Sequence, residues 1–283
     1  MFSDTLTLTA RSLRKWVRNP AAILPGLITS VFWLALFGSS FNPANLIPSG
    51  IGSSSFLSQI QAQIMGQTFS GAPTYITFLT AGIICLILIF NMGFGGIDLV
   101  LDRQLGFLNT LLTAPISRAS IYLAGVLQNF VKAMVIGVLT FVVALVIPNG
   151  LQLAQGFGVL DLIGVFTAIS LLAFGFSLLF TAIALVTKVI DSLVAIVNFL
   201  ILPIVFMSNA MFPTSSFPAW LKAVAEVNPV SKAVEASRLL IINGTLSSAQ
   251  LWTFSSDLIY LVAFVLVLGV FGFALASRAL RAE

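Results

Sequence analysis

The strongest constraint on this fold is a long stretch without charge, because from Asn19 to Ile97 the sequence holds no Asp, Glu, Lys or Arg. The surface of a soluble domain normally devotes about a quarter of its residues to charged side chains. Over the whole chain 59% of residues are hydrophobic and 8% are charged, with a mean hydropathy of +1.09. These values predict a chain that lies in a lipid bilayer.

The apolar segments predict helices rather than a β-barrel. Inside a bilayer the backbone polar groups must be paired within the protein, so only helices and closed barrels cross it. The segments here are continuous over roughly 20 residues, whereas barrel strands alternate over about 10. We therefore expect an all-α polytopic membrane protein with a single transmembrane domain over residues 1–283. Its six predicted spans are 20–41, 74–97, 121–147, 162–186, 193–212 and 258–277.

The positions of Lys and Arg predict the orientation of these spans. Basic residues gather on one side, and the first two loops of the other side have none. The basic side includes Arg11, Arg14, Lys15, Arg18, Arg103, Arg118, Lys188, Arg278 and Arg281. We expect cytoplasmic N- and C-termini and a multi-pass protein of the plasma membrane. The basic residues follow the membrane rim without interleaved aromatic residues, so no nucleic-acid partner is expected.

Two segments outside the spans have amphipathic character. In residues 1–19 the apolar residues Leu6, Ala10, Leu13 and Val17 recur at helical spacing, opposite the basic residues. This pattern favours a helix that lies in the headgroup plane; the alternative is a charged flank that only sets topology. Residues 213–257 are too short and too polar to cross the membrane twice, yet too apolar for a solvated loop. We expect an outer re-entrant helical hairpin there.

The ionisable residues argue against ion-coupled transport. The sequence holds no His, and its lone Cys85 lies in the middle of a span, where it is expected to be a small core residue. Asp161, Asp191 and Asp257 stand at span starts, where the helix dipole favours them. Only Lys132 lies one or two turns inside a span. A secondary carrier that depends on Lys132 is the alternative, and a passive membrane scaffold is a third hypothesis.

The loop at 98–118 contains the segment DRQLGFLNTLLTAPISR, from Asp102 to Arg118. Leu105, Leu108, Leu111 and Leu112 are expected on one face of a helix that Pro115 ends. Such a helix suits either docking of a cytoplasmic partner or packing on the membrane surface.

This loop resembles that of the membrane subunits of type 2 ABC exporters (ABC-2 type), the group that includes the daunorubicin-resistance permease. The family pattern reads approximately D-R-E-x-G-x-L-x-x-L-L-x-x-P-x-S-R. It is matched by Asp102, Arg103, Gly106, Leu108, Leu111, Leu112, Pro115, Ser117 and Arg118, with Gln104 in the place of the usual acidic residue. A second segment, NPVSKAVEASRLLIING, is similar to a family motif through Asn228, Pro229, Ala233 and Arg238.

The resemblance implies a permease dimer coupled to a dimer of separate ABC ATPase subunits through the matched loop residues. The sequence has no G-x-x-x-x-G-K-[ST] loop, so we expect no enzyme activity and no cofactor in this chain, with ATP and Mg on the partner. The translocation path would lie between the second and fifth spans of two protomers. Its candidate lining residues are Asn91, Asn198, Leu202, Val205 and Asn209, although the amides could instead join helices. An apolar path suits amphipathic drugs or lipids; the family also exports polysaccharides and lipid-linked glycans.

Overall fold

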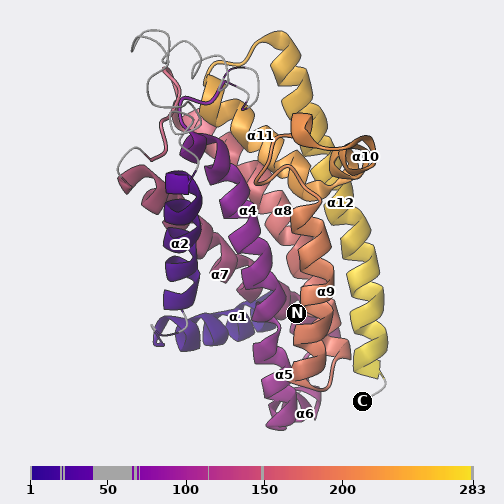
Figure 1. Cartoon of the computed structure of the whole chain (residues 1–283). Helices are drawn as coiled ribbons and strands as arrows, with labels where there is room; N and C mark the ends of the chain where they lie inside the picture. The colour runs from indigo at the N-terminus through magenta and orange to yellow at the C-terminus, as the bar shows by residue number, and fades with distance from the viewer. Residues whose placement is uncertain are drawn as a thin grey trace, which may run out of the picture.

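The computed structural model describes residues 2–19, 21, 23–40, 66, 69, 71–113, 115–147 and 150–281. Over this part of the chain the regular secondary structure is entirely helical, as Figure 1 shows. The helices are α1 (Phe2–Val17), α2 (Leu24–Ser40), α4 (Tyr75–Gly95), α5 (Ile97–Gln104), α6 (Phe107–Thr113), α7 (Arg118–Val146), α8 (Val159–Val186), α9 (Ile190–Phe206), the 3-10 turn η3 (Thr214–Ser216), α10 (Ala219–Val227), α11 (Pro229–Asn243) and α12 (Ser248–Arg281).

Four helical segments of the described chain are long and apolar enough to cross a membrane. They are α4 continued by α5, α7, α8 and α12, and they overlap four of the six predicted spans. The remaining two predicted spans correspond to the shorter apolar helices α2 and α9. An all-helical protein with several membrane-length helices is therefore confirmed, whereas the crossing by all six remains a prediction.

Helix α9 ends at Phe206 rather than at the expected Phe212. Pro203 lies inside its last turn and has no N–H to donate. The hydroxyl of Ser208 donates to the carbonyl of Val205 at 2.6 Å, which occupies an acceptor that a continuing helix would use. The chain therefore leaves the helix after Phe206, and residues 208–211 are still buried in the protein.

Helix α4 is the centre of the bundle. It is buried along most of its length and packs against α2, α7, α8, α9 and α11. Gly82 on α4 allows the chain after α9 to approach closely, because a Cβ at this position would stand 1.9 Å from the carbonyl oxygen of Ala210. The irregular segment after α9 is thereby held directly against the central helix.

Helix α1 lies across the lower end of the bundle in Figure 1, roughly perpendicular to α2 and α4. Thr5 and Thr9 face the protein and are buried, whereas Leu6 and Val17 are 48% and 64% exposed. The predicted amphipathic helix is thus present, and the described residues leave part of its apolar stripe exposed. Helices α5 and α6 and the C-terminus lie at the same end, and α10 and α11 lie at the opposite one (Figure 1).

The helical hairpin of α10 and α11 is held by its motif residues. The Asn228 side chain accepts from the amide of Val230 at 2.9 Å and donates to the carbonyl of Ile204 at 2.7 Å. The buried Arg238 guanidinium donates to the carbonyls of Phe78 at 2.9 Å and Ala210 at 2.8 Å. Both residues therefore fasten α11 to α4 and to the α9 region.

Candidate functional site

A cavity of about 520 Å³ lies between α1, α2, α4 and α7. Much of its wall is aromatic, with Trp16 from α1, Trp33 from α2, and Phe90 and Phe94 from α4. Asp98 of α5 and Lys132 of α7 line the end nearest α5. We call this space the inner cavity; it combines an apolar body with one charged end.

The charged end of the inner cavity is an ion pair. The Lys132 ammonium lies 2.6 Å from Oδ2 of Asp98, and the two side chains are 11% and 38% exposed. A lysine inside a span needs an opposite charge or a route to the interface, and Asp98 provides the charge. Our sequence analysis missed Asp98 because it placed this residue just beyond a span end. The need of Lys132 for a counter-charge was the signal that could have found it.

The candidate path residues do not form one surface within a protomer. Asn91 lines the inner cavity, where its amide donates to the carbonyl of Ile87 at 2.9 Å. Gly93, two positions along α4, instead faces Val197 and Ile201 of α9. Within one protomer Asn91 therefore points away from α9.

The residues expected on a common face of α9 differ in their burial. Val205 is 1% exposed and lies on the buried stripe of α9. Leu202 is 46% exposed, and Asn198 is partly buried beside it. Asn209 lies beyond the end of α9, where it is buried. Asn198, Leu202 and Val205 lie within one sector of α9, so the prediction of a shared helical face is wrong for Asn209 alone, which lies beyond the helix end. The path-lining role of these residues stays a prediction.

The predicted docking loop consists of two short helices instead of one. Gly106 has a φ of +76°, which favours glycine, and it turns the chain between α5 and α6. As a result Leu105 is 79% exposed while Leu108 is 1% exposed. The prediction that these two leucines share a face is therefore wrong. Leu111 is half-buried on α6 and Pro115 is exposed, whereas the side chain of Leu112 lies outside the described part of the structure.

The polar residues of this loop contact the same chain. Arg103 donates to the carbonyls of Leu185 at 2.6 Å and Thr187 at 2.7 Å, where it closes the C-terminal end of α8. Gln104 donates to the carbonyl of Lys188 at 3.2 Å. Asp102 is half-buried one turn after Asp98. These contacts tie α5 to the connection between α8 and α9.

The loop is also joined to α1. The guanidinium of Arg11 lies 3.7 Å from the centre of the Phe107 ring, which links α1 to α6. Through these contacts α6 is linked to α1 and, through α5, to the end of α8.

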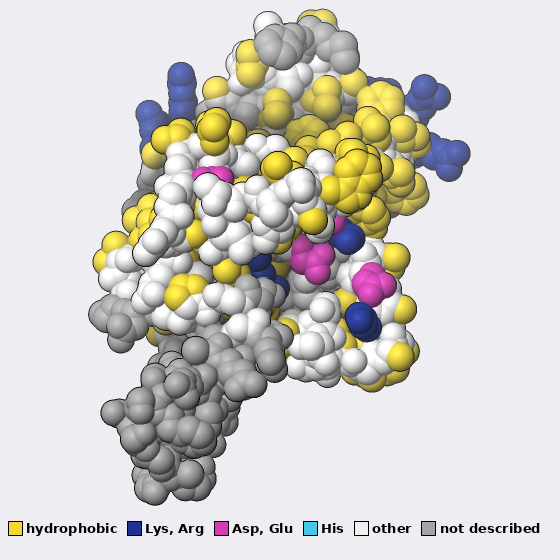
Figure 2. All heavy atoms as spheres, turned by 90° about the horizontal axis from the view of Figure 1, so that it is seen from above, with side chains coloured by type: hydrophobic (Ala, Val, Ile, Leu, Met, Phe, Trp, Pro, Cys, Tyr) yellow, Lys and Arg dark blue, Asp and Glu magenta, His cyan; other side chains and the backbone are white. Residues whose placement is uncertain are grey.

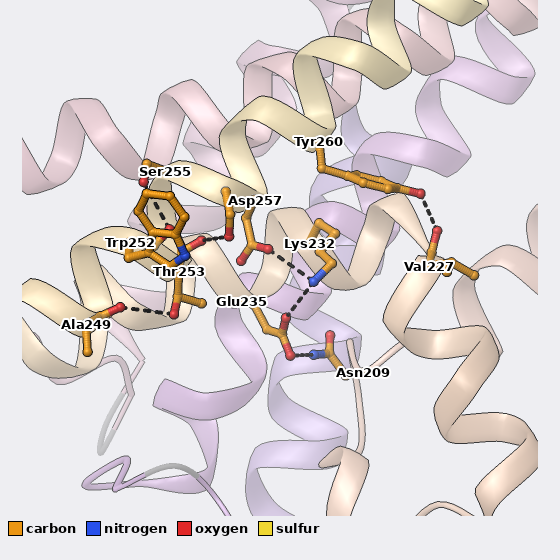
Figure 3. Close-up of polar contacts among 11 residues, drawn as sticks. Asn209, Val227, Lys232, Glu235, Ala249, Trp252, Thr253, Ser255, Asp257 and Tyr260 are labelled. Carbon is orange, nitrogen blue, oxygen red and sulfur yellow. Dashed lines mark hydrogen bonds and ion pairs between the residues drawn. The ribbon is translucent and has the colours of Figure 1, made fainter.

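The opposite end of the molecule carries a second polar group, drawn in Figure 3. Asn209 donates to Glu235 at 3.0 Å, and Lys232 lies 3.8 Å from Glu235 and 3.2 Å from Asp257. Burial raises the pKa of the Glu235 carboxyl, and the Lys232 ammonium opposes this rise. Figure 2 looks onto this end and shows acidic and basic side chains gathered around a hollow. A pocket of about 390 Å³ there is lined by Asn209, Glu235 and Arg238.

Comparison with known proteins places these features in a family. The sequence profile of the ABC-2 type transporter matches residues 3–242. A putative transport permease ycf38 of Porphyra purpurea is 28% identical over 96% of this chain and 86% of its own length. The daunorubicin resistance ABC transporter permease protein DrrB1 of Streptomyces coeruleorubidus is 24% identical over 74% of this chain and 72% of its own length. A probable doxorubicin resistance ABC transporter permease protein DrrC of Mycobacterium tuberculosis is 24% identical over 89% of this chain and 83% of its own length.

Proposed function

Since the chain belongs to the ABC-2 type transporter family, we propose that it is the membrane subunit of an ATP-driven exporter. It works as a dimer with separate ATPase subunits and does not hydrolyse ATP itself. The observation that carries this proposal is the family match, which extends over residues 3–242.

The helices α5 and α6 support the proposed coupling to an ATPase. They lie at the end of the bundle that also holds α1 and the C-terminus (Figure 1). Their contacts reach α1 through Arg11 and the end of α8 through Arg103. A partner that pushed on α6 would therefore move several helices together. We place this end in the cytoplasm, with both termini, because the basic residues gather there.

The proposed substrate is a hydrophobic or amphipathic molecule, such as a drug or a lipid. The apolar lining of the inner cavity supports this class, and two relatives are named for resistance to daunorubicin and doxorubicin. An export permease for polysaccharide or lipid-linked glycan is the competing assignment within the same family.

The test is ATP-driven transport by a reconstituted complex. The chain is purified with its ATPase partner and placed in liposomes, and accumulation of a fluorescent amphipathic drug is followed after addition of ATP. We expect accumulation with ATP and none with ADP or with a partner that cannot hydrolyse ATP. Failure of any ATPase to drive flux would favour a membrane scaffold.

A secondary carrier is tested in the same liposomes. It would show uptake driven by a proton or sodium gradient without ATP, and Lys132→Met would abolish that uptake. We expect no gradient-driven uptake, because almost all ionisable residues of the predicted spans lie at helix ends.

A further inference from the structure

We propose that the inner cavity is a binding site for a cationic amphiphile of drug size, with Asp98 as the residue that holds the cationic head. Treating this ligand as a transport substrate rests on the proposed function, whereas the binding itself does not.

The cavity has the size and length for such a molecule. Its volume of about 520 Å³ falls within the range of small-molecule sites. Along α4 and α5 its lining runs from Leu86 to Asp98, which corresponds to about 18 Å at the usual helical rise. A two-chain lipid would exceed this space, while a drug or a single alkyl chain with a compact head would fit it.

The cavity also has a gradient of polarity. Trp33 and Leu86 line one end, Phe90 and Phe94 follow with the amide of Asn91 between them, and the ion pair lies at the other end. This order matches a molecule with an apolar body and one charged head. Trp16 of α1 also lines the cavity, so the site includes the helix that we expect at the membrane surface.

The sign of the charge on the ligand's head group follows from the exposure of Asp98 and Lys132. The Asp98 side chain is 38% exposed, whereas that of Lys132 is 11% exposed and directed at Oδ2 of Asp98. A ligand therefore reaches the carboxylate more readily than the ammonium. Aromatic faces favour cations in the same way, because the ring quadrupole attracts positive charge. Lys132 orients the Asp98 carboxylate without closing it off.

The test measures binding by this chain alone, in nanodiscs of neutral lipid and without an ATPase. Three probes share a twelve-carbon chain and differ only in the head: trimethylammonium, phosphocholine and sulfate. We expect saturable binding of the trimethylammonium probe and weaker binding of the other two. Preference for the sulfate probe would overturn the proposal.

Variants identify the residues involved. Asp98→Asn should weaken binding of the trimethylammonium probe on the order of fivefold, and Trp33→Ala should weaken it by a similar factor. Lys132→Met should strengthen it, because the carboxylate loses its competing ammonium. Asp191→Asn is the matched control, since this exposed acid lies at the start of α9 and outside the cavity lining.

The Lys132→Met variant separates the proposal from its competitors. If Lys132 held an anionic or zwitterionic head, this variant would lose binding, and that result would overturn our assignment. If Asp98→Asn fails to fold because Lys132 loses its partner, the binding measured for Lys132→Met and Trp33→Ala still tests the proposal. Binding of the probe without ATP-driven transport would refute the proposed function but would still support the proposed binding site.

Discussion

At each end of this molecule a single arginine joins helices by donating hydrogen bonds to buried backbone carbonyls. Arg238 joins α11 to the carbonyls of Phe78 and Ala210, and it also lies 3.6 Å from the centre of the Phe78 ring. Arg103 does the same for the end of α8. Both arginines match the motifs on which the family resemblance was based. Their matched positions are thus explained by packing within this chain as well as by any contact with a partner.

Replacing Arg238 with Met should destabilise the protein. The carbonyl of Ala210, which lies outside any helix, would lose its donor, at a cost of about 1–3 kcal/mol. The measurement is the thermal unfolding midpoint in detergent. Lys222→Met on the exposed side of α10 is the control and should change the midpoint little. Equal midpoints for the two variants would contradict the fastening role.

At the scale of elements, the loop after α4 shows where reasoning from sequence succeeded and where it stopped. Helical spacing predicted a single helix through Gly106, and helix is found after it, in α6. The positive φ of Gly106 was not visible in that spacing, and it separates Leu105 from Leu108. The partners of Arg103 and Asp98 lie far away along the chain, on α8 and α7. Periodicity describes one helix at a time, so it cannot supply contacts of this kind.

Leu108 and Leu111 of α6 should respond differently to truncation. Leu108→Ala removes a buried side chain and should lower the unfolding midpoint, at a cost of about 2–5 kcal/mol. Leu111→Ala should leave the midpoint almost unchanged, because this side chain is only half-buried. It should instead reduce ATPase retention and transport together, by about 1–2 kcal/mol of contact energy. Leu112→Ala is expected to act as Leu111→Ala does.

Retention of the ATPase is measured by co-purification in detergent, and unfolding is measured on the same preparations. Full ATPase retention and full transport in both the Leu111 and the Leu112 variant would indicate that α6 packs on the membrane surface instead of docking an ATPase.

At the scale of the whole molecule, α9 presents a large apolar face that the described part of the chain does not cover. Phe199 and Leu202 are 76% and 46% exposed, whereas Val205 is 1% exposed. A proposed dimer would use the exposed face. Leu202→Cys should therefore crosslink to its copy in a second protomer, and Val205→Cys should not. We would read crosslinking on a non-reducing gel, in a Cys85→Ser background; a Leu202→Cys variant that stays monomeric would argue against this interface.

Orientation is tested with two further cysteines in the same background. Leu105→Cys, in the exposed turn between α5 and α6, should resist an impermeant thiol reagent in intact cells. Ser247→Cys, exposed before α12, should react. Opening the cells should make both sites reactive. Reaction of Leu105→Cys in intact cells would reverse the topology and remove the basis for ATPase docking at α6.

A feature of this structure could be predicted from the sequence only where its cause is local or affects every residue of a segment. Composition and segment length sufficed to predict an all-helical membrane protein, since burial in lipid affects every residue of a span. The start of α11 at Asn228 and Pro229 was also visible, because capping chemistry is local. The inner cavity was not, because its wall comes from five helices that the sequence separates.

The unequal lengths of α9 and α12 also bear on the bilayer itself. At about 1.5 Å per residue, the 17 residues of α9 span about 25 Å and the 34 residues of α12 about 51 Å, against a hydrocarbon thickness of about 30 Å. The predicted span within α12, residues 258–277, is about 30 Å long by the same rise, so the ends of this helix would project beyond the lipid. If α9 also crosses, as the sequence predicts, it is about 5 Å short, and the lipid beside it would have to thin. Transport in liposomes should then vary with acyl-chain length and be fastest in the thinner bilayers that match α9, which would make the annular lipid a mechanical component of the transporter.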